Sequence, residues 1–285
     1  MKVLVTGVAG QLGYDVVNEL EKRGHTAIGV DIKEMDITDA AVCERVITNA
    51  APDAVIHCAA WTAVDAAEDN EEKVRAVNAQ GTENIARVCK AIEAKMMYIS
   101  TDYVFDGQGE TPWKPDCKDY EPLSVYGKTK LEGELAVSGL LEQFFIVRIA
   151  WVFGLNGKNF IRTMLGLGQK YDTLRVVNDQ IGTPTYTYDL ARLLVDMIET
   201  EKYGYYHATN EGGYISWADF AKEIFRQAGM NTQVIPVTTA QYGLSKAVRP
   251  FNSRLDKSKL VEQGFESLPD WQDALKRYLK EISKE

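Results

Sequence analysis

The chain has 285 residues, of which 45% are hydrophobic and 26% are charged, and its net charge is −9 at pH 7. This composition is typical of a soluble globular protein with one large domain or two smaller ones. An acidic chain has no general positive field to collect phosphates, which argues against a nucleic-acid or membrane-surface role. Any anionic small ligand must therefore be held by local groups.

The cysteine and histidine residues favour a reduced, metal-free protein. The four cysteines are widely spaced without a C-x-x-C pair, and the three histidines are scattered. This spacing predicts free thiols and no zinc site. The N-terminal apolar run is too short for a signal peptide, and no run approaches the roughly 18 residues of a membrane span. We therefore expect a cytoplasmic protein.

The N-terminal residues have the order of strand, glycine loop, helix, strand and acid. Residues 2–6 predict a buried strand, glycines stand at positions 7, 10 and 13, and residues 11–24 have helical spacing. Residues 26–30 predict a second strand, which Asp31 follows directly. Glycines let the backbone approach a pyrophosphate at the helix N-terminus, and the acid can bond a ribose diol. The pattern predicts a dinucleotide site; a tightly packed strand-turn-helix crossover is the alternative.

Asp31 bears on which cofactor binds. An acid at this position repels a 2′-phosphate and so favours NAD over NADP. Lys33 lies nearby and weakens that inference. Both NADPH and NADH therefore stay open.

The next elements continue the alternation of helix and strand. Residues 36–50 and 68–94 have helical patterns, and residues 54–60 and 96–100 predict strands. Ala59 and Ala60 are small enough to let a flat cofactor pass over the edge of the sheet, unless they serve packing alone. Thr101 stands at the carboxyl end of the fourth strand, where it can bond a substrate oxygen or merely cap the next turn.

A tyrosine and a lysine then stand four residues apart. Tyr126 and Lys130 share one face of a predicted helix that Ser124 can cap. A cation beside a phenol favours the phenolate, so we expect Lys130 to lower the pKa of Tyr126. Such a phenol suits proton transfer near neutral pH. Because Y-x-x-x-K is common on surface helices, its weight comes from Thr101 and the glycine loop.

The alternation extends to a strand at residues 144–152 and predicts an α/β fold, a Rossmann-type doubly wound parallel sheet. Beyond it we expect helices at 159–168, 188–200, 216–229 and 270–282, a short strand at 174–177, and a strand at 203–208 that returns to the sheet. We assign residues 1–153 and about 186–210 to a dinucleotide-binding domain. Residues 154–185 and 211–285 then form a smaller C-terminal substrate-binding lobe.

These residues together resemble the extended short-chain dehydrogenase/reductases, which act largely on nucleotide sugars. Longer runs are similar, more narrowly, to the dTDP-4-dehydrorhamnose reductase family, and they extend over nearly the whole chain. They are G-Q-L-G at 10–13, T-A-V-D at 62–65, S-T-D-Y-V-F at 100–105, V-Y-G at 125–127, W-V at 151–152, N-D-Q at 178–180, G-T-P-T at 182–185 and R-P-F-N-S at 249–253. The glycine loop alone is not specific.

The resemblance implies a reaction in dTDP-rhamnose, and hence polysaccharide, biosynthesis. NADPH or NADH would deliver a hydride to the C4 keto group of dTDP-4-dehydro-L-rhamnose and give dTDP-L-rhamnose. Tyr126 would donate a proton to the developing alkoxide, and Thr101 would bond the same oxygen. Lys130 would bond the nicotinamide ribose and lower the tyrosine pKa.

The resemblance also implies the binding residues. Cofactor contacts would come from Gly7, Gly10, Gln11, Leu12, Asp31, Ala59, Ala60, Asn78, Ser100, Tyr126 and Lys130. The sugar would be surrounded by Thr62, Val64, Asp102, Tyr103 and Trp151, and the phosphates or base by Asn178, Gln180, Arg249 and Arg254. For the two arginines, a solvated surface position is an equal alternative.

In one respect, a possible magnesium site, the chain departs from the pattern of this family. Some family members dimerise through a magnesium site built of glutamates, and Asp15 stands where the first would be. The other positions cannot be placed, so we expect no required metal and either a monomer or a homodimer.

Two rival functions stay open. A nucleotide-sugar dehydratase or epimerase belongs to the same superfamily, but the dehydratases lead one to expect Thr-Asp-Glu where this chain has Tyr103. A non-catalytic subunit resembling the regulatory partner of methionine adenosyltransferase could lose Tyr126 or Lys130. Both residues are present, which favours an enzyme.

Overall fold

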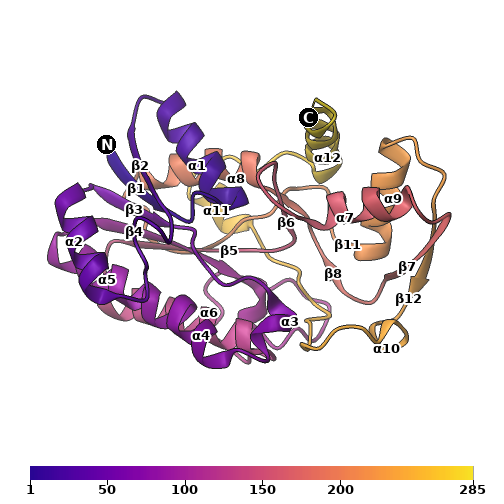
Figure 1. Cartoon of the computed structure of the whole chain (residues 1–285), viewed down its shortest axis with the longest axis horizontal. Helices are drawn as coiled ribbons and strands as arrows, with labels where there is room; N and C mark the ends of the chain where they lie inside the picture. Colours follow the sequence, from indigo (N-terminus) through magenta and orange to yellow (C-terminus); the bar gives the residue numbers. More distant parts are fainter. Residues whose placement is uncertain (285) are drawn as a thin grey trace.

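A six-stranded parallel sheet forms the centre of the protein, whose computed structural model describes residues 1–284 (Figure 1). The strand order is β10-β5-β4-β3-β1-β2. The strands are β1 (Lys2–Thr6), β2 (Thr26–Val30), β3 (Ala54–His57), β4 (Lys95–Thr101), β5 (Phe144–Ile149) and β10 (Gly204–His207). The predicted return of the chain to the sheet is confirmed, because β10 pairs in parallel with β5. The order reverses between β1 and β3, where ligands of such sheets bind.

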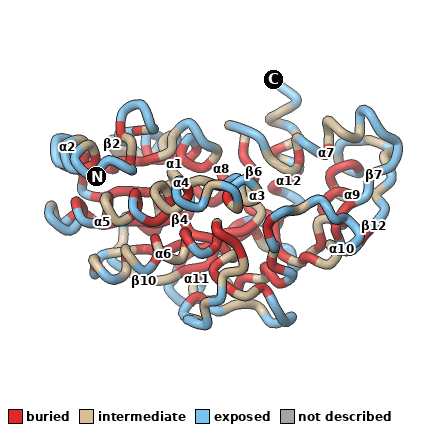
Figure 2. The backbone as a smooth tube through the Cα atoms, turned by 60° about the horizontal axis from the view of Figure 1, so that its bottom comes forward, coloured by how far each residue is buried: buried red, intermediate tan, exposed pale blue. Residues whose placement is uncertain are grey.

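Helices cover both faces of this sheet and confirm the doubly wound fold. One face packs against α1 (Gln11–Lys22), α8 (Thr187–Ile198) and α11 (Ser258–Glu262). The other face packs against α2 (Ala40–Ala50), α5 (Gly81–Ala91) and α6 (Val125–Leu140). Figure 2 shows the central strands as the buried part and the outer turns of these helices as exposed. Strands buried on both faces read as continuous apolar runs, which is why the sequence predicted them well.

A smaller lobe has a core of its own. It contains α7 (Phe160–Gly168), β7 (Thr173–Val177), α9 (Trp217–Gln227), β12 (Gln233–Val237) and α12 (Trp271–Ile282). Strand β7 pairs in parallel with β12. Two pairings of two-residue strands lie nearby: β6 (Val152–Phe153) with β9 (Thr185–Tyr186), and β8 (Ile181–Gly182) with β11 (Ile215–Ser216). Helix α10 (Thr239–Tyr242) has four residues.

One segment of the C-terminal part packs away from this lobe. Leu260, Phe265 and Leu268 belong to the core beneath the large sheet, beside β10. Apolar contacts, rather than position in the chain, decide which core a segment joins. The domain ranges set out from the sequence stay a prediction.

Several elements are shorter than their patterns predicted. The second helix begins at Ala40 because the Asp39 carboxylate accepts the N–H groups of Ala41 and Val42. The stretch 68–94 is divided into α4 (Glu71–Arg75), a π-helical turn (Ala76–Gln80) and α5. The strand predicted at 144–152 ends at Ile149, because Trp151 has a φ of 52° and turns the chain into β6. No helix within residues 1–284 has the length and apolar character required to cross a membrane.

Candidate functional site

The glycine loop lies tightly against the end of β3. Gly7 has a φ of +70°, and a Cβ there would lie 2.8 Å from the Cα of Ala59. A Cβ on Gly13 would lie 2.3 Å from the carbonyl oxygen of Gly7. Gly10 is the cap residue of α1 and makes no side-chain hydrogen bond, so no cap side chain occupies the first N–H groups of this helix. A helix N-terminus of this kind attracts an anionic group such as a pyrophosphate.

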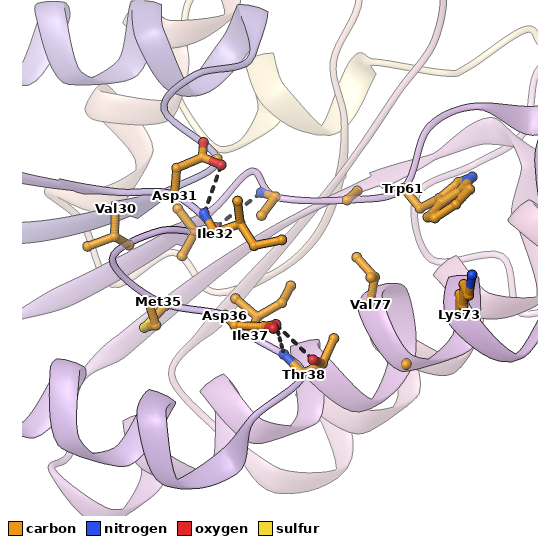
Figure 3. A pocket seen from close by; sticks show the side chains of 15 residues that line it. Val30, Asp31, Ile32, Met35, Asp36, Ile37, Thr38, Trp61, Lys73 and Val77 are labelled. Atoms are coloured by element: carbon orange, nitrogen blue, oxygen red, sulfur yellow. Dashed lines mark hydrogen bonds between the residues drawn. The ribbon is translucent and has the colours of Figure 1, made fainter.

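A cavity of about 400 Å³ opens beside this loop (Figure 3). Figure 3 shows Asp31 near one end, and Trp61 with Lys73 at the other. Four predicted cofactor residues line it, namely Gly7, Asp31, Ala59 and Ala60. Asp31 accepts hydrogen bonds from the N–H groups of Ala9 and Ile32, both at 2.9 Å. These bonds hold the carboxylate at the cavity wall, where it can meet a ribose diol.

Lys130 is placed by helix α6 against the carboxyl end of β4. Its side chain is buried, and Nζ donates to the Ile99 carbonyl at 2.7 Å. The ammonium also lies 4.0 Å from the centre of the Tyr98 ring. Burial lowers the pKa of Lys130 to about 7. Ser124 caps the helix, as predicted, by accepting the N–H of Gly127.

The pKa of Tyr126 differs from the prediction. Burial raises the pKa of this phenol, the nearby Asp102 and Tyr103 raise it further, and the hydrogen bond with Thr101 works in the opposite direction. The prediction that Lys130 lowers this pKa is wrong in this structure. Helical spacing puts both residues on one face, but it does not determine where a long lysine side chain ends. The ammonium reaches the Ile99 carbonyl instead.

Polar groups at the end of β4 surround this tyrosine. The Thr101 hydroxyl donates to Oδ1 of Asp102 at 3.0 Å, and burial raises the pKa of Asp102 to about 6. The rings of Tyr103 and Tyr126 meet edge to face, with centres 5.4 Å apart. Oγ of Ser100 is buried and has no hydrogen-bond partner among the described residues. A buried hydroxyl without a partner indicates a place where a ligand atom can complete the bonding.

Three predicted cofactor residues use their side chains inside the protein. Asn78 accepts the N–H of Trp61 at 2.8 Å and donates to the hydroxyl of Thr129 at 3.2 Å. It thereby ties the cavity wall to the helix of Tyr126. Gln11 accepts the N–H of Gly154 at 2.8 Å, and Leu12 is buried. The backbones of residues 11 and 12 remain at the loop, whereas these side chains hold it in place.

A second cavity, of about 370 Å³, lies between the large sheet and the smaller lobe. Four predicted substrate residues line it, namely Tyr103, Trp151, Gln180 and Arg249. The indole of Trp151 stacks on that of Trp217, with ring centres 3.7 Å apart. Residues that the sequence analysis did not assign to the substrate also line it; they include Asp65, Phe160, Arg175, Trp217 and Ser245. The sequence signal for two of them was an aromatic residue within a predicted helix, namely Phe160 in 159–168 and Trp217 in 216–229.

The remaining predicted substrate residues lie outside the linings of both cavities. Thr62 and Asn178 are exposed, and Val64 begins the short helix α3 (Val64–Ala67). Arg254 donates to Oδ1 of Asn252 at 3.0 Å. Asp102 is fully covered beneath the hydroxyl of Thr101. Their direct contact with substrate stays a prediction.

Comparison with known proteins agrees with this geometry. The family model described as the RmlD substrate binding domain matches residues 1–284. The chain belongs to this family. A dTDP-4-dehydrorhamnose reductase from Streptomyces griseus is 40% identical over 278 residues, which cover 95% of this chain and 91% of that protein.

Solved structures of RmlD-family proteins agree as well. The crystal structure of a dTDP-4-dehydrorhamnose reductase from Clostridium acetobutylicum has a TM-score of 0.96 and 40% identity, and covers 99% of this chain and 100% of its own. The enzyme from Bacillus anthracis, solved in complex with NADP, has a TM-score of 0.94 and 38% identity, with 98% and 99% covered. The family predicted from the sequence is confirmed.

Asp15 takes an unexpected place in this RmlD-family chain. Its buried carboxylate accepts the hydroxyl of Thr187 on α8, and burial raises its pKa to about 6. Asp189 lies near enough to raise that pKa further. The side chain therefore points into the contact between α1 and α8, and its place in this chain is that of a core carboxyl.

Gly7→Ala should weaken cofactor binding far more than it weakens the fold. The new Cβ meets the backbone of Ala59 in a left-handed conformation, which costs about 1–3 kcal/mol and displaces the loop. We expect at least a tenfold loss of NADPH or NADH affinity by fluorescence titration. Gly24→Ala is the matched control, because Gly24 has a φ of +79° and nothing within 4 Å. Equal cofactor affinities of the two variants would contradict the assignment.

Proposed function

We propose that this chain reduces the C4 keto group of dTDP-4-dehydro-L-rhamnose to dTDP-L-rhamnose with NADPH or NADH. The observation that supports it most is the position of Tyr126. Its ring meets that of Tyr103, a wall of the second cavity, while Asn78 connects its helix to Trp61, a wall of the first. A proton donor between a dinucleotide cavity and a second ligand cavity suits a ketone reductase.

The residues of the first cavity fit a nicotinamide cofactor. Gly7 leaves no room for a Cβ beside Ala59, and Asp31 lies in the cavity wall. Outside this lining, on β4, the buried hydroxyl of Ser100 has no partner among the described residues. When bound, the reduced nicotinamide supplies a hydride to the carbonyl carbon. Lys130, on α6 beside the end of β4, would bond the ribose hydroxyls.

Proton transfer would come from Tyr126. Because burial raises its pKa, the phenol keeps its proton at neutral pH and can donate it to the developing alkoxide. Thr101 would bond the same oxygen and orient it. Hydrogen-bond donors aimed at developing charge are a large part of such catalysis.

The substrate would lie in the second cavity. The stacked indoles of Trp151 and Trp217 offer flat apolar surface to the sugar or base. Arg249 is already bonded to Asp65 and Tyr103, at 2.7 and 3.1 Å. Arg175 donates to the Gln241 carbonyl and has no carboxylate partner within the described part of the chain. We therefore assign the diphosphate to Arg175 before Arg249 or Arg254.

Arg175→Gln should raise the KM for the sugar nucleotide about 10- to 100-fold and change kcat little. A hydrogen bond to a charged group contributes about 1.5–3 kcal/mol, and the diphosphate is remote from the reacting carbon. Initial rates measured over a range of sugar-nucleotide concentrations give both constants. Arg254→Gln serves for comparison, because Arg254 is bonded to Asn252 outside the cavity. A larger KM change in Arg254→Gln would reverse this assignment.

The whole proposal is tested by following nicotinamide absorbance with a panel of freshly generated 4-keto nucleotide sugars. Oxidation of NADPH or NADH that depends on the dTDP-linked sugar supports it. No oxidation with any member of the panel would refute a reductase. Related sugars in the panel identify another nucleotide-sugar reductase if one of them is preferred.

The rival dehydratase is disfavoured by Tyr103. Burial raises the pKa of this phenol to about 12, and its hydroxyl accepts a hydrogen bond from Arg249. Such a group cannot replace a carboxylate as an eliminating base. A non-catalytic subunit has no need of Thr101, Tyr126 and Lys130 together. A cytoplasmic location, a monomeric or homodimeric state, and the division into a dinucleotide-binding domain and a substrate-binding lobe remain parts of the proposal.

A further inference from the structure

The segment 243–250 forms one wall of the second cavity. Leu244, Ser245, Arg249 and Pro250 line that cavity. In Figure 1 this orange segment leaves α10 and passes beside α3, so it joins the smaller lobe to the large one. Within it Leu244 and Val248 are 78% and 57% exposed, whereas Ala247 and Pro250 are buried. Polar contacts hold the segment together with these two buried residues.

Those contacts converge on the carboxylate of Asp65. Oδ1 accepts the N–H groups of Lys246 and Ala247, both at 3.0 Å. Oδ2 accepts Nη2 of Arg249 at 2.7 Å. One carboxylate of the large lobe thus accepts three hydrogen bonds from a single segment of the smaller lobe. A charge-assisted bond of this kind is stronger than a neutral one.

The short helix that carries Asp65 is itself fixed to the catalytic helix. The next residue after α3, Glu68, accepts the N–H of Val125, the first residue of α6, at 2.9 Å. Arg249 also donates to the hydroxyl of Tyr103, whose ring meets that of Tyr126. Asp65 therefore joins the wall of the substrate cavity to the platform that positions the proton donor.

We propose that Asp65 is a positioning residue that latches the segment 243–250 over the second cavity as a lid. The latch opens when the three bonds to Asp65 break, and this admits or releases the ligand. The inference rests on the proposed function for the ligand beneath the lid, the nucleotide part of a sugar nucleotide. The latch itself depends only on the contacts of Asp65 and is tested without any sugar.

Asp65→Asn removes the negative charge of this side chain and keeps its shape. The amide oxygen can still accept the N–H groups of Lys246 and Ala247, but the amide nitrogen then faces Nη2 of Arg249, a donor against a donor. Trypsin needs an extended stretch of chain on both sides of its cleavage site, so the rate of cleavage after Lys246 reports release of the segment. We expect the fragment 1–246, followed by mass spectrometry, to form about tenfold faster in this variant than in the wild type. The melting temperature should change little.

Asp69→Asn is the matched control. Asp69 pairs with the ammonium of the same Lys246, but both side chains are more than half exposed, and exposed pairs contribute little. We expect wild-type cleavage for this control. Binding of dTDP and steady-state rates add a second readout, in which Asp65→Asn weakens dTDP and raises KM about tenfold with kcat little changed.

The outcomes separate the two proposals. Equal rates of cleavage in the wild type, Asp65→Asn and Asp69→Asn overturn the latch, whatever sugar is reduced. Faster cleavage in Asp65→Asn alone supports the latch, even if no 4-keto sugar is reduced and the proposed function fails. Faster cleavage in both variants shows that surface charge, rather than Asp65, holds the segment, and this also overturns the latch.

Discussion

Tyr126→Phe should lower turnover by about 10²–10⁴-fold, the usual range for loss of a general acid. The phenyl ring keeps its edge-to-face contact with Tyr103, so the fold and both cavities should persist. The variant loses only the hydroxyl that would protonate the alkoxide. The measurement is kcat with the dTDP-linked 4-keto sugar, together with a titration of NADPH or NADH.

Cofactor affinity is the control for this variant. It should remain within a few-fold of the wild type, because the phenol bonds the reacting oxygen and not the adenosine end of the cofactor. Most of the activity surviving in Tyr126→Phe would show that another group donates the proton. Asp102, whose pKa burial raises to about 6, would then be the next candidate to replace.

Glu134→Gln should lower the free energy of unfolding by about 3–5 kcal/mol, because it leaves a buried guanidinium without its countercharge. Glu134 and Arg148 are both fully buried, and two N–H···O bonds of 2.8 and 2.7 Å join them. The pair connects α6 with β5. Chemical denaturation with urea measures the loss.

Two further variants test this reading of the buried pair. Glu83→Gln breaks the exposed pair with Arg87 on α5 and should cost at most about 1 kcal/mol. Glu134→Leu combined with Arg148→Met removes both charges and should recover much of the loss. Recovery should be incomplete, because Arg148 also donates to the Pro115 carbonyl and the Tyr120 hydroxyl. A loss in Glu134→Gln no larger than in Glu83→Gln would contradict the argument.

Local patterns predicted the elements that build the first cavity. The apolar runs, the glycine spacing and Asp31 all lie within the first 31 residues, in one strand-helix-strand unit whose two strands pair with each other. The cap at Ser124 and the placing of Tyr126 and Lys130 on one helix are local in the same sense. For that reason they could be inferred without a structure.

Contacts between distant residues could not be inferred in this way. The carbonyl that accepts a hydrogen bond from Lys130, a residue of helix α6, belongs to Ile99 on strand β4. The side chains of Asn78 and Gln11 accept the N–H groups of Trp61 and Gly154. The amino-acid types suggested ligand contacts for all three. Only folding reveals that a polar side chain already has an internal partner.

By itself, the amino-acid sequence determined the alternating α/β order, the glycine loop, and the presence of Thr101, Tyr126 and Lys130. The tertiary structure alone decided the composition of the second cavity, which gathers Tyr103, Trp151, Arg175, Trp217 and Arg249 from both lobes. It also decided the direction of the Tyr126 pKa, which depends on how completely neighbouring elements exclude water from the phenol. Periodicity records which face of an element is buried, whereas a cavity and its electrostatics arise where faces of distant elements meet.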